Sequence, residues 1–434
     1  MKNLILTLII TLPLTLWGQE WTKTFGGLGE EYGSSVQQTT DGGFIITGRT
    51  NSFGFSNDVY LIKTYENGVE QWSKTFGESE NDNGNFVQQT TDGGFIIIGN
   101  TNSFSINNGS EIWLIKTDEN GEEQWNQTFG GVEQDYGKSV QQTIDGGFII
   151  IGQTESFGNG GRDVYLIKTD ENGIEQWNQT FGGLDNDFGE SVQQTNDGGY
   201  IIIGSTGSFG NSVSNIWLIK TDNIGNELWS KTYGGTENIS GYSVQQTTDG
   251  GFILTGSTNS VLSENGTEIW LIKTDINGIE QWNQTFGGLD NDFGYSVKQT
   301  NDGGYIITGQ TWSFGNGESD VFLIKTDEDG EEQWFQTFGG TEIDRSISVQ
   351  QTNDSGYIIT GQTWSFGNGE SDIYLIKTDD QGNITSTIEI PLPNPNRKLE
   401  KTINLKGQEI NPKTNTPVIE IFDDGSVEKK IIVE

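Results

Sequence analysis

The chain of 434 residues has no cysteine and no histidine, and it has only one methionine and six prolines. The absence of cysteine excludes a disulfide framework and a lipoprotein anchor. The absence of both residues excludes Ser-His-Asp and Cys-His nucleophilic sites and the usual zinc sites. A carboxylate pair, as in glycoside hydrolases, is the catalytic arrangement that remains. With 61 Asp and Glu residues, such pairs arise by chance and do not identify an enzyme.

Basic residues are also scarce, and the net charge is −38. Residues 19–386 carry 15 basic and 53 acidic side chains. The field of such a chain repels polyanions, which argues against nucleic acid and anionic membrane surfaces as partners.

No run in the main part of the chain shows the period of an amphipathic helix, but a longer period is evident. The tetrapeptide Leu-Ile-Lys-Thr occurs seven times, at intervals of 52 or 53 residues. A period that constant predicts a repeat architecture in which each unit packs against its neighbours. The seven lysines are expected to be structural, with the stem packed between units and the ammonium paired to a nearby carboxylate. They are Lys63, Lys116, Lys168, Lys220, Lys273, Lys325 and Lys377.

One unit, residues 139–182, contains four β-rich runs joined by connections too short for a crossover helix. Asp145-Gly146 and Asn172-Gly173 are typical of tight hairpin turns. The apolar runs barely alternate with polar residues, which suits strands that are covered on both faces. Each unit is therefore predicted to be an antiparallel four-stranded sheet packed between copies of itself. The four runs are Ser139–Thr143, Phe148–Gly152, Val164–Thr169 and Trp177–Phe181.

The count of strands predicts a closed ring rather than an open solenoid. Seven strands begin with Trp, and the first, at Trp21, precedes the first hairpin. The last unit has its hairpin and the Tyr374–Thr378 strand but lacks the fourth strand. If Trp21–Phe25 completes that unit, both exposed sheet edges disappear. The prediction is an all-β protein, with a seven-bladed β-propeller over residues 19–386 and a small β-rich tail over residues 387–434.

Two resemblances support this fold. The segment LIKTDENGEEQW (Leu114–Trp125) resembles the tryptophan-docking repeat of quinoprotein-like propellers, and the GGF/Y-I-I-x-G segments look kelch-like. Both motifs are structural, and they imply a propeller without implying an activity. The chain differs from quinoproteins, which usually have eight repeats, and it offers no identifiable cofactor ligands.

The two ends predict export. Residues 1–18 have a positive start, an apolar stretch and Gly18 before Gln19, as in a secretory signal peptide. The C-terminal segment closely resembles the sorting domain of type IX secretion substrates in Bacteroidetes. That resemblance implies the type IX machinery as a partner and an extracellular or cell-surface location after the tail is removed. The matching residues include Gly407, Asp423, Asp424, Gly425, Glu428, Lys429 and Lys430.

Two tryptophans interrupt the regularity of the repeats. Trp312 and Trp364 lie in identical QTWSFGNGESD segments, where other units carry Asn, Glu or Gly. In neighbouring blades they are expected to form a platform for sugar rings or for a protein partner. The alternative is that each packs under its own loop.

Acidic residues gather in the loops of the predicted face that carries these tryptophans. Carboxylates and amides near glycine are ligands suited to Ca²⁺, although no stretch matches an EF-hand. The alternative is a solvated acidic face. The candidate residues are Asp185, Asp187, Asp290, Asp292, Asp320 and Asp372.

The expected function is that of a monomeric, non-catalytic binding propeller outside the cell, which recognises a glycan or a surface protein. The acidic surroundings of the aromatic platform favour neutral sugars or cationic partners. No cofactor is expected apart from Ca²⁺. The two alternatives are a carboxylate-dependent glycoside hydrolase and a purely structural surface protein.

Overall fold

The computed structural model describes residues 20–54, 56–105, 109–210, 213–235, 239–259, 266–384, 398–403, 410, 417–422 and 427–431. The chain divides into two compact units, Met1–Thr385 and Ser386–Glu434. The predicted signal peptide, residues 1–18, lies outside the described residues, as do Gly407, Asp423, Asp424 and Gly425 of the predicted sorting tail. Within the described ranges, no helix is long and apolar enough to cross a membrane.

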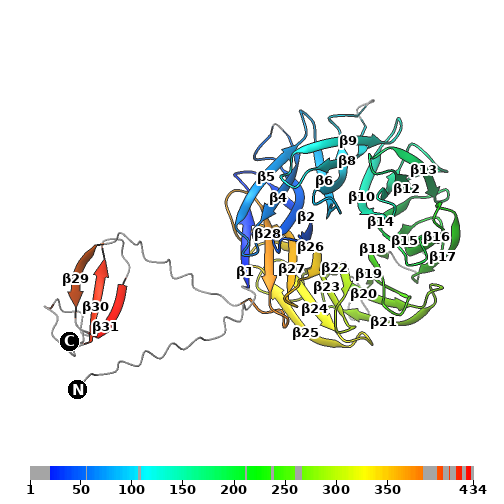
Figure 1. Ribbon diagram of the computed structural model, residues 1–434. Coiled ribbons are helices and arrows are strands. Elements are labelled where there is room, and N and C mark those ends of the chain that lie inside the picture. The colour runs from blue at the N-terminus through cyan, green and yellow to red at the C-terminus, as the bar shows by residue number, and fades with distance from the viewer. Residues whose placement is uncertain are drawn as a thin grey trace, which may run out of the picture. The chain divides into compact units, whose positions relative to one another are not determined.

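The first unit is a seven-bladed β-propeller of four-stranded antiparallel sheets, which confirms the predicted fold (Figure 1). We number the blades in chain order. Blade 1 contains β2 (Glu31–Gln38), β3 (Phe44–Thr50), β4 (Asp58–Thr64) and β5 (Glu70–Phe76). Blade 2 contains β6 (Asp82–Gln89), β7 (Phe95–Thr101), β8 (Glu111–Thr117) and β9 (Glu123–Phe129). Blade 3 contains β10 (Asp135–Gln142), β11 (Phe148–Thr154), β12 (Asp163–Thr169) and β13 (Glu175–Phe181).

Blades 4 to 7 repeat the same order of strands. They contain β14 (Asp187–Gln194), β15 (Tyr200–Thr206), β16 (Asn215–Thr221) and β17 (Glu227–Tyr233); β18 (Ser240–Gln246), β19 (Phe252–Asn259), β20 (Thr267–Thr274) and β21 (Glu280–Phe286); β22 (Asp292–Gln299), β23 (Tyr305–Thr311), β24 (Asp320–Thr326) and β25 (Glu332–Phe338); and β26 (Asp344–Gln351), β27 (Tyr357–Thr363) and β28 (Asp372–Thr378) with β1 (Trp21–Phe25).

The ring closes through the first strand of the chain. β1 pairs antiparallel with β28, in a register that places Trp21 opposite Lys377 and Phe25 opposite Ile373. The N-terminal strand therefore supplies the outer strand that blade 7 lacks, as predicted. Every blade in the ring lies between two other blades. The ring therefore has no exposed end, which in an open stack would favour aggregation.

Tryptophan docking repeats around the outside of the ring. Trp21 packs edge-on against Phe44 of blade 1, with ring centroids 5.9 Å apart. It also lies over Gly68 in the β4–β5 turn, where a methyl group would be only 2.6 Å from the indole. Gly68 has a φ of 75°, so both the backbone angle and the close contact require glycine. The same contact joins each Trp to the turn of the next blade.

The repeat lysines have the structural role that was predicted. Lys63 Nζ is 2.9 Å from Asp41 of the β2–β3 turn, and its side chain is only 5% exposed. It also donates to the carbonyl of Thr64 at 2.9 Å. The other six lysines make the same ion pair within their own blades, at 2.8–3.1 Å. Each pair fixes a hairpin turn to the third strand of its blade.

The innermost strands are longer than the sequence indicates. β10 begins at Asp135, four residues before the predicted start at Ser139, and a bulge lies between Gly137 and Ser139. The bulge explains the difference, because an extra residue with a glycine beside it breaks the β-pattern in the sequence. The same irregularity occurs in the innermost strand of every blade.

The second unit contains a three-stranded antiparallel sheet of β29 (Leu399–Ile403), β30 (Pro417–Phe422) and β31 (Val427–Ile431). Glu428, Lys429 and Lys430 of the predicted sorting tail lie in β31, opposite Glu420, Ile419 and Val418.

The closure can be tested with Trp21→Ala. We expect this change to lower the free energy of unfolding by about 3 kcal/mol, because it leaves a void beside Phe44 at the junction that closes the ring. Thr22→Ala, in the same strand but with an exposed side chain, is the control and is expected to change it by less than about 0.5 kcal/mol. Urea unfolding of both variants measures the difference. Equal effects would contradict the role of Trp21.

Candidate functional site: the central channel

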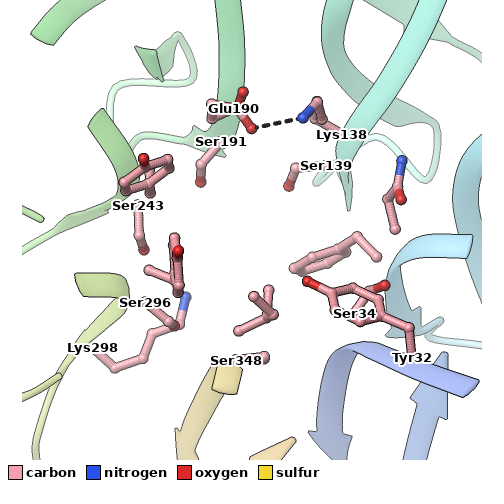
Figure 2. Close-up of a pocket in the computed structure, with 15 residues that line it drawn as sticks. Tyr32, Ser34, Lys138, Ser139, Glu190, Ser191, Ser243, Ser296, Lys298 and Ser348 are labelled. Atoms are coloured by element: carbon pink, nitrogen blue, oxygen red, sulfur yellow. Dashed lines mark ion pairs between the residues drawn. The ribbon is translucent and has the colours of Figure 1, made fainter. Parts of the chain in front are cut away.

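The seven innermost strands are arranged around the axis of the propeller (Figure 1). Figure 2 shows the channel between their side chains. These strands are β2, β6, β10, β14, β18, β22 and β26. Side chains from all seven line a cavity of about 290 Å³. The fourth residue of each blade's D-x-G-x-S-V-Q-Q segment faces this cavity, and it differs from blade to blade. These seven residues are Ser34, Asn85, Lys138, Glu190, Tyr242, Tyr295 and Ile347.

The residues beside these variable positions hold neighbouring blades together. Ser243 Oγ of blade 5 accepts a hydrogen bond from Val297 N–H of blade 6 at 3.3 Å. Ser296 and Ser348 make the equivalent contact with the next blade at 3.4 Å. These three serines, which Figure 2 labels at the channel, are therefore structural.

A ring of glutamines, three residues further along the innermost strands than the variable positions, also joins neighbouring blades. Gln245 Oε1 accepts a hydrogen bond from the backbone N–H of Gln299 in the next blade at 2.7 Å. Five other blades make this contact at 2.6–2.7 Å. Blade 6 alone has Lys298 at this position, and lysine has no acceptor for the N–H of Gln351. Burial lowers the Lys298 pKa, and no described residue forms a salt bridge with it.

One ion pair crosses the channel wall. Lys138 Nζ of blade 3 is 3.1 Å from Glu190 Oε2 of blade 4, with side chains that are 32% and 24% exposed. Figure 2 shows both side chains at the edge of the cavity. Glu190 is the only carboxylate among the described residues that line it.

Arginine and aromatic side chains gather at the end of the channel that the inter-blade loops surround. The guanidinium of Arg345 lies 4.8 Å from the ring centroid of Tyr32, and that of Arg49 lies 5.5 Å from the same ring. Arg162 lies 5.2 Å from the centroid of Tyr136. A second cavity, of about 260 Å³, opens among Tyr32, Arg49, Tyr136 and Arg162. We call these residues, with Arg345, the channel mouth.

The two tryptophans predicted to bind ligand lie beside the channel mouth. Trp364 packs on Arg345, with 5.6 Å between the guanidinium and the ring. Trp312 packs edge-on against Phe293 at 5.9 Å and stays 37% exposed. Both tryptophans thus contact a side chain of their own blade's innermost strand. Phe293 stacks in turn on Tyr295 at 6.1 Å, which continues the aromatic surface into the channel.

Basic side chains are concentrated at the channel and its mouth, although the propeller contains few of them. Of the 15 basic residues in residues 19–386, seven are the repeat lysines. Five of the other eight line the channel or its mouth: Arg49, Lys138, Arg162, Lys298 and Arg345. Arg162 pairs with Glu155 at 2.6 Å. Within the part of the chain that the structure describes, Arg49 and Arg345 form no salt bridge with a carboxylate.

The acidic candidates lie elsewhere. Asp185 and Asp290 are exposed loop residues whose backbone N–H groups donate to Ser208 Oγ and Ser313 Oγ, both at 3.1 Å. The other four, Asp187, Asp292, Asp320 and Asp372, are buried between blades. Asp187 accepts hydrogen bonds from Gly183 N–H at 2.9 Å and Ser208 Oγ at 2.7 Å. None of the six is among the described residues that line the channel.

Most of the channel residues were not predicted from the sequence. A signal was present, because the second and fourth residues of the D-x-G-x-S-V-Q-Q segment vary strongly between units whose other positions are nearly constant. Because the innermost strands begin earlier than the sequence indicates, these residues fall in segments that the sequence predicts as loops. Their common direction toward the axis is not visible in the sequence.

Comparisons with known proteins agree with the fold. No protein-family model matches the chain. Regulatory protein FlaEY of Caulobacter vibrioides is 26% identical over 170 residues, which cover 34% of this chain and 18% of that protein. The match therefore spans less than a fifth of the relative's length.

Two solved structures illustrate the structural likeness. Puromycin hydrolase has a TM-score of 0.50 and 10% identity, covering 91% of this chain and 58% of its own. The extracellular domain of a hybrid two-component system from B. thetaiotaomicron has a TM-score of 0.45 and 13% identity, covering 92% of this chain and 48% of its own. The likeness to puromycin hydrolase shows the propeller fold alone, since one fold serves many activities.

Lys298→Gln tests whether the positive charge of Lys298 lowers the stability of the protein. Glutamine restores the missing contact with Gln351 N–H and removes a half-buried charge, so we expect the free energy of unfolding to rise by about 1 kcal/mol. Because burial lowers the Lys298 pKa, the gain is largest at neutral and lower pH and shrinks as the pH approaches the ordinary lysine value of 10.5. Denaturant unfolding at pH 7 and pH 10 measures both effects.

Gln245→Lys is the matched control, because it breaks the same contact in blade 5. It is expected to destabilise the protein by about 1 kcal/mol or more. If Lys298→Gln is destabilising as well, Lys298 has a structural role and the interpretation is wrong.

Proposed function

We propose that this protein is a secreted, non-catalytic binding propeller whose channel mouth holds an acidic group of a glycan. The observation that carries the proposal is the placement of Arg49 and Arg345 on the ring of Tyr32, without a carboxylate partner in the described residues. Arg345 donates hydrogen bonds from Nε and Nη2 to Gln362 Oε1 at 3.2 and 2.8 Å. In a chain with a net charge of −38, two arginines without a carboxylate partner at the opening of a channel favour an anionic ligand.

The chemistry of the mouth supports a uronic acid or a similar sugar acid. A guanidinium binds a carboxylate through two parallel hydrogen bonds. Tyr32, Tyr136, Trp312 and Trp364 supply aromatic faces, on which the apolar face of a sugar ring packs. Because five basic side chains gather at the channel, we prefer an acidic sugar to the neutral or cationic ligands that the loop composition favours.

The overall charge limits the length of that ligand. A field from −38 charges repels a long polyanion such as nucleic acid. The arginines act at short range in the mouth, where a lower dielectric strengthens their attraction. A chain end, or a short acidic stretch, fits this combination better than a uniformly charged polymer.

The glycoside hydrolase alternative is less well supported. Hydrolysis needs two carboxyl groups that flank the scissile bond. Glu190 is the only carboxylate among the described residues lining the channel, and Lys138 pairs with it. The purely structural alternative accounts for Arg345 through its hydrogen bonds to Gln362, but it does not explain why Arg49 has no carboxylate partner among the described residues.

The binding proposal can be tested with matched polymers. The full chain, starting at residue 19, is applied to immobilised oligogalacturonate and to its methyl-esterified form, which lacks the charge. We expect retention on the acid form only, weakening as salt rises, without release of reducing sugar. Arg49→Ala with Arg345→Ala is expected to weaken binding at least tenfold. Lys74→Ala, which removes an outer-strand lysine paired with Glu122, is the control.

Two results would count against this function. Equal retention of both polymers would exclude recognition of the carboxylate. Release of reducing ends would support the hydrolase instead.

The route of export is a separate proposal, which rests on the signal-like residues 1–18 and on the C-terminal resemblance. We expect a chain lacking residues 400–434 to accumulate in the periplasm of a Bacteroidetes host with a type IX system. Immunoblots of the periplasm, cell surface and medium measure the distribution. A truncated protein that is as abundant outside the cell as the full chain would refute the assignment of the tail.

A further inference from the structure

Lys298 departs from the repeat both in its chemistry and in the direction of its side chain. The other six blades carry a glutamine at this position, and each glutamine accepts a hydrogen bond from the next blade. None of the six glutamines is among the described residues that line the central cavity, whereas Lys298 lines it. The lysine side chain therefore faces the cavity instead of the joint between two blades.

The ammonium group of Lys298 has no acidic partner among the described residues. Glu190 is the only carboxylate that lines the cavity in the described part of the chain, and it pairs with Lys138 at 3.1 Å. Figure 2 shows Glu190 on the side of the cavity opposite Lys298. Lys298 is half-buried, and burial lowers its pKa. A positive charge in such a place normally has a partner that neutralises it.

Two hydroxyl groups on the same side of the cavity are also donors without an acceptor. Ser296 Oγ accepts a hydrogen bond from Val349 N–H at 3.4 Å, and Ser348 Oγ accepts one from Val36 N–H at 3.4 Å. A serine that accepts in this way still has its own hydrogen to donate. No described residue accepts that hydrogen from either serine. This part of the channel therefore offers a positive charge and donors, but no acid.

Aromatic and apolar side chains face the same cavity. The rings of Tyr242 and Tyr295 meet edge to face, with their centroids 5.1 Å apart, and Phe86 and Ile347 also line the cavity. Its volume is about 290 Å³, close to the lower end of the range for small-molecule sites. Such sites are mostly apolar, with a few polar groups that fix the orientation of the ligand.

The change at Lys298 also lowers the number of contacts between blades. Lysine has no acceptor for Gln351 N–H, so the bridge from blade 6 to blade 7 is missing. A residue that gives up stability in one unit of a regular repeat is expected where function requires it.

We propose that Lys298, with the hydroxyl groups of Ser296 and Ser348, forms a site inside the channel for the carboxylate of a small organic acid. The ammonium group and the hydroxyls donate hydrogen bonds to the carboxylate oxygens, and the charged bond is the strongest of them. A flat apolar body packs against Tyr242 and Tyr295. The volume of the cavity suits a body of about one ring.

This site is separate from the channel mouth. Lys298 is the seventh residue of its D-x-G-x-S-V-Q-Q segment, and Arg345 is the second residue of the corresponding segment in blade 7. Five residues of extended strand, roughly 15 Å, lie between the two levels. The inference uses no arginine of the channel mouth, and it stands whether or not a glycan binds there.

The first experiment compares ligands that differ in charge and in shape. Benzoate joins a carboxylate to one flat ring, and benzamide has nearly the same shape without the charge. The full chain, starting at residue 19, is titrated with each by calorimetry at pH 7 and constant ionic strength. We expect saturable binding of benzoate at a single site, and binding of benzamide that is at least tenfold weaker. Equal affinities, or no binding of benzoate, would overturn the proposal.

Acetate and chloride test the contribution of the apolar body. Both are expected to bind more weakly than benzoate, because neither can pack against the two tyrosine rings. If either binds as tightly as benzoate, the site takes any compact anion and the organic acid is the wrong ligand.

The second experiment changes the lysine itself. Lys298→Gln copies the residue of the other six blades, so the fold accommodates it, and Lys298→Met removes the charge without restoring the bridge to Gln351. Both are expected to lose at least tenfold in affinity for benzoate. Lys74→Gln, on an outer strand where the lysine pairs with Glu122, is the matched control. Unchanged affinity in the two Lys298 variants would show that benzoate binds elsewhere.

Thermal unfolding gives an independent measurement of the same site. A ligand that binds the folded state raises the midpoint of unfolding. We expect benzoate to raise the midpoint of the natural protein but not that of Lys298→Gln, although the variant is the more stable of the two without ligand. A rise of the same size in both proteins would contradict a site at Lys298.

Discussion

The pairing of β1 with β28 is the constraint on which the rest of the structure depends. A stack of seven sheets has two exposed ends unless the first and last blades meet. This chain meets the requirement by dividing one blade between its two ends, so that Trp21 lies opposite Lys377. Once the ring is closed, every blade has two neighbours. The same lysine pairs and tryptophan contacts repeat in every blade, and the glutamine bridges repeat at six junctions. Stability is thus distributed over positions that recur in nearly every repeat.

That distribution leaves a few positions free to differ, and they are the ones that face the axis. The fourth residue of the innermost strand packs against no neighbouring blade in a way that the repeat requires. It can be serine, asparagine, lysine, glutamate, tyrosine or isoleucine, while the glutamine three residues further along the strand bridges to the next blade in six of the seven blades. A propeller built in this way separates its framework from its binding surface along the length of a single strand. Lys298 is the exception, because it occupies a framework position.

The sequence predicts the framework well and the channel poorly, for one physical reason. Regular spacing, Asp-Gly turns and Trp strands are local signals, and they gave the seven blades, the closure and the pairing of the repeat lysines. The bulge beside Gly137 hides the first half of the innermost strand, and with it Lys138 and its counterparts in the other blades. Trp312 and Trp364 were recognisable because they are large and unique. Their neighbour Arg345 was not, because its contact with Tyr32 joins residues more than 300 positions apart.

Departures from a repeat are the most informative feature of such a chain, because each one breaks a contact that six sister units keep. Lys298 gives up a bridge between blades, and a position that loses stability in one blade alone needs another reason to persist. Asn215 and Ile239 depart together, on two blades, at a junction whose counterpart between blades 6 and 7 carries the buried acids Asp320 and Asp344. Burial and the facing carboxylate of Asp344 raise the Asp320 pKa, so the residue at one position affects the cost of an acid at the other. The joint replacement therefore argues that the two positions of a junction are coupled.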